Sequence, residues 1–196
     1  MWSIRPIHVA ICFSASSFLA GCQSINTAPK APITPTVEAP QVDNQFQLNG
    51  KIGVRTPQQS GSAFFTWIQD GDNFDLELTG ILGIGKTMIS GTADGVTLNS
   101  SKTGLIEANS PEELLQRATG WQAPITHLVD WVQARPADTN ATTQKDAAGR
   151  IIQIIEDGWT VDLSYVDQAT LPNRLILKQR LANDAENRIT MLIQNR

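Results

Sequence analysis

Large apolar side chains alternate with polar ones over much of the chain that follows residue 45. The sequence FDLELT at residues 74–79 alternates in this way, and the same period of two returns at 159–166 and at 189–193. A period of two brings the apolar side chains to one face of a β-strand, so it predicts half-buried strands. Turn-forming residues separate these strands, for example at 69–73 (QDGDN) and at Asp157-Gly158. The pattern therefore predicts an antiparallel sheet or barrel of short strands.

The middle of the chain predicts two helices. The segment SPEE at residues 110–113 is typical of a helix start, with Ser110 as the N-cap, proline at the first helical position and Glu113 closing a capping box. A second helix is predicted between Pro124 and Pro136. Its apolar side carries Ile125, Leu128, Val129 and Val132. Strands, then helices, then strands predict an α+β domain with helices against one face of a sheet.

The first 22 residues have the layout of a secretory signal. One basic residue, Arg5, precedes an apolar stretch over 7–19 that is shorter than the ~20 residues needed to span a bilayer. The stretch ends in LAGC at 19–22, which resembles the lipobox of bacterial lipoproteins. We therefore predict that residues 1–21 are removed and that Cys22 is acylated. The alternative is an ordinary cleaved signal with a cysteine there by chance.

Residues 22–44 are expected to connect the lipid anchor to the folded part. This segment is rich in proline and almost free of large apolar side chains, which is typical of an extended tether. In the lipoproteins that it resembles, an aspartate directly after the cysteine keeps the protein at the inner membrane. Gln23 stands there, so the outer membrane, at its periplasmic face, is the expected location. Residues 45–196 are then predicted to form a single domain.

Composition and spacing narrow the classes of function. The formal net charge is −4 and the sequence has no basic cluster, which argues against nucleic-acid binding. His127 is the only histidine after Cys22, and no zinc-site spacing, catalytic triad or G-x-S-x-G motif accompanies it. We therefore expect no active site, no metal and no cofactor, apart from the covalent lipid on Cys22.

The string GILGIGKT at residues 80–87 fits the spacing of a nucleotide-binding P-loop. A P-loop leads into a helix, whereas the residues after Thr87 favour strand and turn. A nucleotide-dependent enzyme that uses Lys86 and Thr87 is therefore a minor hypothesis. The same loop is unusually apolar for the tip of a hairpin, since it carries Ile81, Leu82 and Ile84. Such a tip either enters lipid or a partner's groove, or folds back into the core.

Four tryptophans follow Cys22: Trp67, Trp121, Trp131 and Trp159. Aromatic residues on strands and on a covering helix usually form an ordinary core. They are also suited to line a hollow between sheet and helices, which would fit an acyl chain. The sequence pattern allows both interpretations.

Several segments together resemble the LolB family, outer-membrane lipoproteins that receive other lipoproteins at the end of their sorting pathway. The resemblance covers most of the chain after Cys22. It rests on the order of the matching segments along the chain, together with the lipobox. The segments are FFTWIQ at 64–69, LELTGILG at 76–83, GWQAPI at 120–125, LVDWV at 128–132, GWTV at 158–161 and PNRL at 172–175.

The resemblance implies a fold, partners and site residues. The fold is an antiparallel sheet curled into an unclosed half β-barrel, with helices as a lid over an apolar cavity. The protein would take acylated lipoproteins from a LolA-type periplasmic carrier and insert them among outer-membrane phospholipids as a monomer, without ATP or catalysis. The loop residues Ile81, Leu82 and Ile84 would enter the membrane. The expected acyl-chain cavity comprises Phe65, Trp67, Leu76, Leu78, Trp131 and Trp159. The alternative is a structural envelope lipoprotein with an aromatic core and no ligand.

Overall fold

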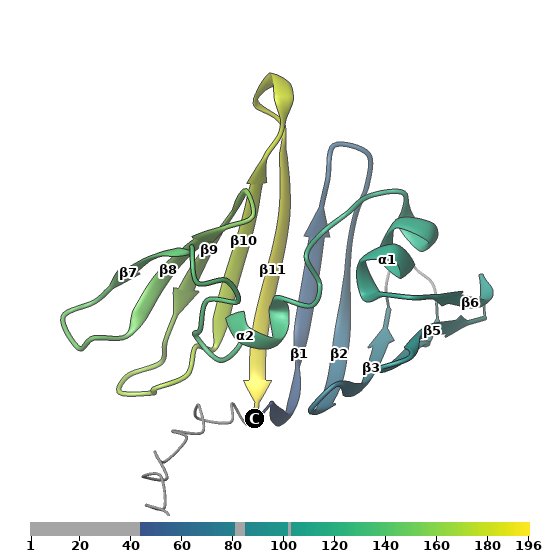
Figure 1. Cartoon of the computed structure of the whole chain (residues 1–196), viewed down its shortest axis with the longest axis horizontal. Coiled ribbons are helices and arrows are strands. Elements are labelled where there is room, and N and C mark those ends of the chain that lie inside the picture. The colour runs from purple at the N-terminus through teal and green to yellow at the C-terminus, as the bar shows by residue number, and fades with distance from the viewer. Residues whose placement is uncertain (1–43, 81–84, 102) are drawn as a thin grey trace, which may run out of the picture. The chain divides into compact units, whose positions relative to one another are not determined.

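The computed structural model describes residues 44–80, 85–101 and 103–196 (Figure 1). They belong to a compact unit, Gln41–Arg196, which contains every described strand and its own hydrophobic core. A unit with its own core is expected to fold by itself. The predicted signal peptide, the acylated Cys22, the tether before Asn44 and the loop residues Ile81, Leu82 and Ile84 lie outside the described residues.

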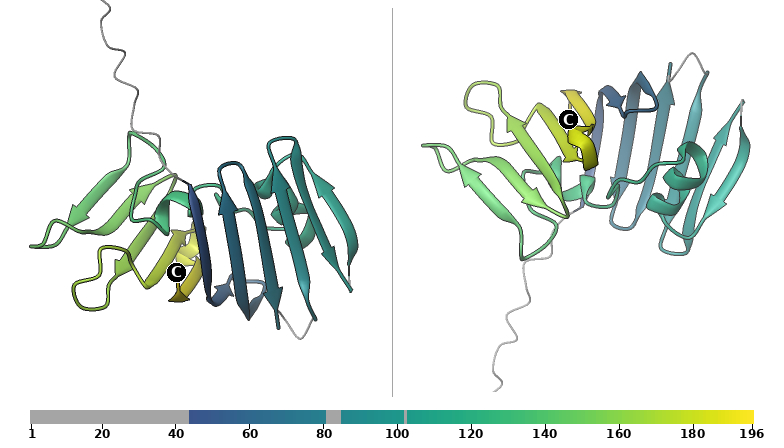
Figure 2. Two further views of the ribbon diagram at one scale, coloured as in Figure 1. Left: turned by 90° about the horizontal axis from the view of Figure 1, so that it is seen from below. Right: turned by 90° about the horizontal axis from the view of Figure 1, so that it is seen from above.

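One antiparallel sheet contains all eleven strands of the described residues, in the order β6-β5-β4-β3-β2-β1-β11-β10-β9-β8-β7. The strands are β1 (Gln45–Arg55), β2 (Ser60–Asp70), β3 (Asn73–Thr79), β4 (Thr87–Thr92), β5 (Gly95–Ser100), β6 (Gly104–Ala108), β7 (Thr142–Lys145), β8 (Ile151–Glu156), β9 (Trp159–Ser164), β10 (Arg174–Arg180) and β11 (Glu186–Asn195). β6 and β7 are the two edges, so the sheet is curled but not closed (Figure 2). The prediction of an unclosed antiparallel sheet in an α+β fold is confirmed.

Chain order and sheet order agree except at the middle of the sheet, where β1 pairs with β11. The other neighbours follow one another along the chain, and the predicted turn residues lie between them. Gly71 and Gly158 adopt positive φ angles of 59° and 75° in two of these turns, a conformation that glycine adopts without steric strain. The alternation is confirmed in β11, where Ile189, Met191 and Ile193 are buried.

Helix α1 (Pro111–Thr119) begins and ends as its sequence predicts. The Ser110 hydroxyl accepts a hydrogen bond from the Glu113 N–H at 3.1 Å, and Gly120 ends the helix with φ 81°. The capping box differs in one detail, because the Glu113 carboxylate accepts from the backbone N–H of Asn109 and not from that of Ser110. That hydrogen bond and the pairing with Arg117 outweigh burial and lower the pKa of Glu113.

The second helix is much shorter than predicted. Only Leu128–Trp131 forms an α-helix (α2), and turns occupy the rest of the segment between the two prolines. No side chain caps its N-terminus, and Ala134 has a positive φ of 57°, which ends the helical path before Pro136 is reached. The only other helix in the described ranges is the 3-10 turn η2 (Ala182–Asp184). None of the helices described is both long and apolar enough to cross a membrane.

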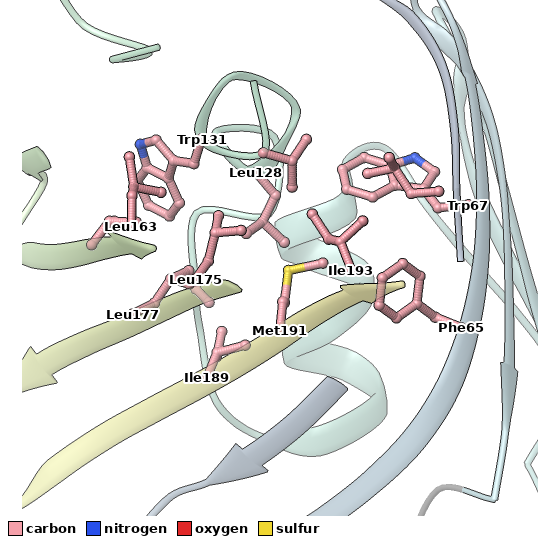
Figure 3. Close-up of a cluster of buried hydrophobic side chains, with 14 of the residues drawn as sticks. Phe65, Trp67, Leu128, Trp131, Leu163, Leu175, Leu177, Ile189, Met191 and Ile193 are labelled. Carbon is pink, nitrogen blue, oxygen red and sulfur yellow. The ribbon is translucent and has the colours of Figure 1, made fainter. Parts of the chain in front are cut away.

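The main core lies between the concave face of the sheet and the segment around α2 (Figure 3). Figure 3 shows Trp131 beside Leu163 on one side of this cluster, and Phe65 with Trp67 on the other. A smaller cluster joins Leu114 of α1 to Val96 and Leu98 of β5. The two helices therefore cover different parts of the same sheet face, α1 near β5 and β6 and α2 over the centre.

Candidate functional site

An apolar cavity of about 340 Å³ lies between the concave face of the sheet and the segment from α1 to α2. Strands β1 to β5 and β11 supply its floor. Its volume falls in the range of pockets that bind small ligands, ~300–1,000 Å³. Apolar side chains form most of the lining, including Phe65, Trp67, Leu76, Leu78, Leu115, Trp121, Ile125, Leu128, Ile189 and Met191.

The structure brings together four of the six residues predicted to form an acyl-chain cavity. Phe65 and Trp67 come from β2, and Leu76 and Leu78 from the neighbouring β3. Phe65 is directly opposite Leu78, and Trp67 is directly opposite Leu76. Side chains of directly opposite residues share one face of a sheet, so these four form a continuous apolar wall.

Trp131 and Trp159 are not among the lining residues. They are 0% and 1% exposed and belong to the core. The indole N–H of Trp131 donates to the buried carboxylate of Glu156 on β8, which orients this ring toward the half of the sheet that contains β8 to β10. Period-two alternation predicts that a side chain faces inward, but it does not predict which half of a curled sheet it covers.

The helix side of the cavity was missed by the site prediction. Leu114, Leu115 and Ala118 of α1 contribute to the lining, followed by Trp121 and Ile125 beyond the helix. Their spacing of three and four residues along α1 is the sequence signal for one apolar helix face. That signal predicts burial but does not distinguish a packed interface from the wall of a hollow.

The buried polar groups on the cavity wall are satisfied by the protein itself. The Trp67 indole N–H donates to the Gln69 side-chain oxygen at 2.9 Å, and the Gln69 amide donates to the Gly71 carbonyl at 2.8 Å. Phe46 packs edge-on against Trp67, with ring centroids 4.9 Å apart. A wall of this kind binds by apolar contact and offers few polar groups to fix one particular ligand.

The P-loop-like string does not form a nucleotide site in the residues described. Thr87 begins strand β4 and is buried, so a strand follows the Gly-Lys-Thr and not a helix. The Lys86 ammonium lies 2.8 Å from the carboxylate of Glu77 on β3. Without a helix N-terminus to face a phosphate, the main electrostatic feature of a P-loop is missing.

His127 lies at the start of α2, beside the turn between β8 and β9. Its Nδ1 is 3.3 Å from a carboxylate oxygen of Asp157, but the alignment does not make a hydrogen bond. Its ring meets Trp131 edge-on at 5.6 Å. These contacts are packing contacts, and no group of three metal-binding side chains occurs among the described residues.

The sequence profile described as "Outer membrane lipoprotein LolB" matches residues 44–195. The chain belongs to the LolB family of outer-membrane lipoproteins. The predicted resemblance is thereby confirmed, and with it the location at the outer membrane and a role in lipoprotein localisation. The matched range begins at the first residue described and contains every strand of the sheet.

Individual relatives agree with this membership. The chain is 38% identical over 153 residues to the outer-membrane lipoprotein LolB of Stutzerimonas stutzeri, a match that covers 76% of this chain and 72% of that protein. The LolB of Pseudomonas putida is 43% identical over 136 residues, covering 67% of this chain and 66% of its own length, just under two thirds. The LolB of Pseudomonas fluorescens is 32% identical over 195 residues, covering 94% and 93%.

Among solved structures, a LolA superfamily protein from Nitrosomonas europaea is similar to this chain. The TM-score is 0.47 at 12% sequence identity, and the superposition covers 79% of this chain and 88% of that chain.

Proposed function

We propose that this protein receives acylated lipoproteins from a LolA-type periplasmic carrier and passes their acyl chains to the outer membrane. It acts as a monomer, without ATP, cofactor or catalysis. The observation that carries the proposal is the apolar cavity walled by β2 and β3 on one side and by the α1 segment on the other. A structural envelope lipoprotein, the alternative, has no need for such a hollow.

The energetics favour a transfer between apolar sites. An acyl chain of roughly fifteen methylenes gains on the order of 12 kcal/mol on leaving water, at about 0.8 kcal/mol for each methylene. A chain exposed midway would lose most of this free energy, so the transfer is feasible without ATP only if one apolar site follows another. Binding by apolar contact also accepts many different cargo proteins.

The cavity is tested by titrating a form that begins at Gln23, and therefore lacks the acylated cysteine, with a triacylated peptide. We expect a saturable blue shift of tryptophan emission at one-to-one stoichiometry, because Trp67 lines the cavity. The Trp67→Phe variant should lose much of this shift. Trp159→Phe is the matched control, since Trp159 is also buried but lies outside the lining.

Two results would contradict acyl binding. One is the absence of any shift with the acylated peptide while circular dichroism shows a folded protein, which would favour the structural alternative. The other is an equal shift with the unacylated peptide, since the peptide part alone would then account for the signal.

The apolar loop is proposed to help place the acyl chains into the membrane. Ile81, Leu82 and Ile84 lie outside the described residues, so this role rests on their sequence and on the family resemblance. A glutamate at position 82 should resist entry into hydrocarbon. We expect Leu82→Glu to bind acylated peptide as the parent does but to deliver it to vesicles more slowly. Leu171→Glu is the control, because Leu171 is an exposed leucine elsewhere, and equal delivery by both variants would argue against the loop.

A further inference from the structure

The outer, convex face of the sheet carries an open hollow. It shares the backbone region of Val54, Ser60, Gly61 and Ser62 with the acyl cavity, and its other lining residues belong to it alone. Gly53 of β1 forms its base, and Ser62 and Thr190 lie directly opposite Gly53 on the two neighbouring strands. Arg55 and Arg188 line it further along the same strands. The hollow measures about 490 Å³.

Gly53 leaves real space at this position. A Cβ atom added there would meet no atom closer than the Gly61 carbonyl oxygen at 3.9 Å. The hydroxyls of Ser62 and Thr190 flank this space, and Ser60 lies beside Arg55 in the next row. The hollow therefore offers guanidinium and hydroxyl donors around a position that no side chain fills.

The charges around the hollow are unusual for a chain with a formal net charge of −4. Arg55 lies directly opposite Arg188, and Arg188 lies directly opposite Lys178 on β10. Lys178 pairs with Asp162 at 2.8 Å, and the charge of Arg188 also helps to lower the pKa of Asp162, but neither arginine makes a direct ion pair within the described residues. Like charges directly opposite each other destabilise a sheet, so an anion bound here would stabilise the row.

The chemistry of the donors fits a phosphate group. The planar guanidinium of arginine donates in a fork that matches phosphate oxygens, and hydroxyls complete such a site as further donors. A phosphate in the hollow would lie between Arg55 and Arg188 and reduce their repulsion.

The surroundings of the hollow favour a lipid as the source of that phosphate. In the row next to Gly53, Lys51 lies between Phe64 and Leu192, which are 59% and 41% exposed. The Lys51 ammonium is 5.9 Å from the centre of the Phe64 ring. Exposed apolar side chains interleaved with basic ones are typical of surfaces that lie in the membrane interface.

We propose that this hollow binds the phosphate of an anionic phospholipid headgroup, so that the outer face of β1, β2 and β11 rests on a lipid surface. Its cations, Arg55 and Arg188, are not among the residues that line the acyl cavity, although Ser60 and Ser62 line both. It would orient the domain at the membrane in addition to the lipid on Cys22.

The form that begins at Gln23 allows the test, because it contains the whole compact unit and no anchor. Flotation with phosphatidylcholine vesicles, with and without phosphatidylglycerol, measures the affinity. We expect clear binding only with phosphatidylglycerol, and a loss of about tenfold or more in the double variant Arg55→Gln/Arg188→Gln. Gly53→Asp, which places a carboxylate in the hollow, should give a similar loss.

The control is the double variant Lys145→Gln/Arg117→Gln, which removes the same charge from exposed positions outside the hollow, on β7 and on α1. Its affinity should stay within about twofold, because the interaction falls off within a Debye length. An equal loss in both double variants, or equal binding to the two kinds of vesicle, would contradict an anion site in the hollow.

Binding of inorganic phosphate or of polyglutamate without any binding to vesicles would show that the hollow binds an anion other than a lipid headgroup. Circular dichroism shows whether each variant is folded. If the arginine double variant does not fold, the binding of Gly53→Asp decides the test.

Discussion

At the scale of single residues, Glu156 holds the segment after α2 against the sheet. Its buried carboxylate accepts hydrogen bonds from the Trp131 indole and from the backbone N–H groups of Ala137 and Asp138. An unsatisfied buried donor costs about 1–3 kcal/mol. We therefore expect Glu156→Ala to lower the free energy of unfolding by about 3 kcal/mol or more in urea titrations. Glu107→Ala, at an exposed glutamate, should change it by less than about 0.5 kcal/mol, and a similar small change in both variants would contradict this role.

Two glycines of β1 form a matched pair for a second prediction. A Cβ atom on Gly50 would lie 1.9 Å from the Leu192 carbonyl oxygen and 2.9 Å from the Phe65 ring, whereas one on Gly53 meets open space. Backbone atoms cannot move aside cheaply, so Gly50→Ala should destabilise the protein by about 1–3 kcal/mol. Gly53→Ala should be neutral or slightly stabilising, since alanine loses less backbone entropy on folding. Equal thermal midpoints for the two variants would show that β1 adapts at Gly50.

At the scale of elements, α1 depends on its cap and on one buried side chain. Leu114 is 3% exposed and packs against β5, while the Ser110 hydroxyl satisfies one N–H group of the first turn. Loss of an N-cap hydroxyl costs about 1 kcal/mol. We expect Ser110→Ala to lower the free energy of unfolding by that amount. Ser164→Ala, at an exposed strand end, is the control, and a smaller effect at 110 than at 164 would be inconsistent with the cap.

The elements also differ in how well their sequences predict them. Buried and more exposed side chains alternate along β9 and along most of β11. This alternation arises because one face of each strand packs on the core and the other faces water. The segment between Pro124 and Pro136 has helical spacing, yet only Leu128–Trp131 is helical. The contact between Trp131 and Glu156, which are 25 positions apart, decides the path of this segment. A pattern of neighbouring residues cannot predict a contact between residues so far apart.

At the scale of the whole molecule, stability should depend on acid pH. Hydrogen bonds from Arg150 outweigh burial and lower the pKa of Asp146. Burial opposes the ionisation of Asp162, but Lys178 and Gln153 donate to it and leave its pKa lowered as well. A lowered folded-state pKa contributes stability above the ordinary value, here 3.8, that is lost as the pH falls through the folded-state value.

We therefore expect the urea midpoint to be constant near neutral pH and to fall below about pH 4. Asp146→Asn and Asp162→Asn should each lower the midpoint at pH 7 and make the fall toward acid pH shallower. A midpoint that stays constant down to pH 2 would mean that these carboxylates are not stabilised by folding.

The candidate site was likewise predicted only in part, because some of its residues are set by local sequence and others by contacts between distant parts of the chain. The family resemblance implied six cavity residues, and four of them, Phe65, Trp67, Leu76 and Leu78, lie together because they alternate on adjacent strands joined by a tight turn. The resemblance also implied Trp131 and Trp159, and both are buried, but they pack in the core beside the cavity. The sequence pattern predicts that a side chain is buried. It does not predict whether the side chains of the opposing element fill the space above it or leave a cavity.

The sequence by itself determined the strands and turns, the capped helix and the family of this protein. The strands, turns and helix follow from side-chain periodicity and from turn and cap residues, which act within a few positions of the chain. The family follows from the order of the matching segments along the chain. Tertiary structure alone decided the pairing of β1 with β11, the length of α2, the cavity and the row of cations on the outer face. Each of these depends on residues that are far apart in sequence and become neighbours only when the sheet has curled and its register is set.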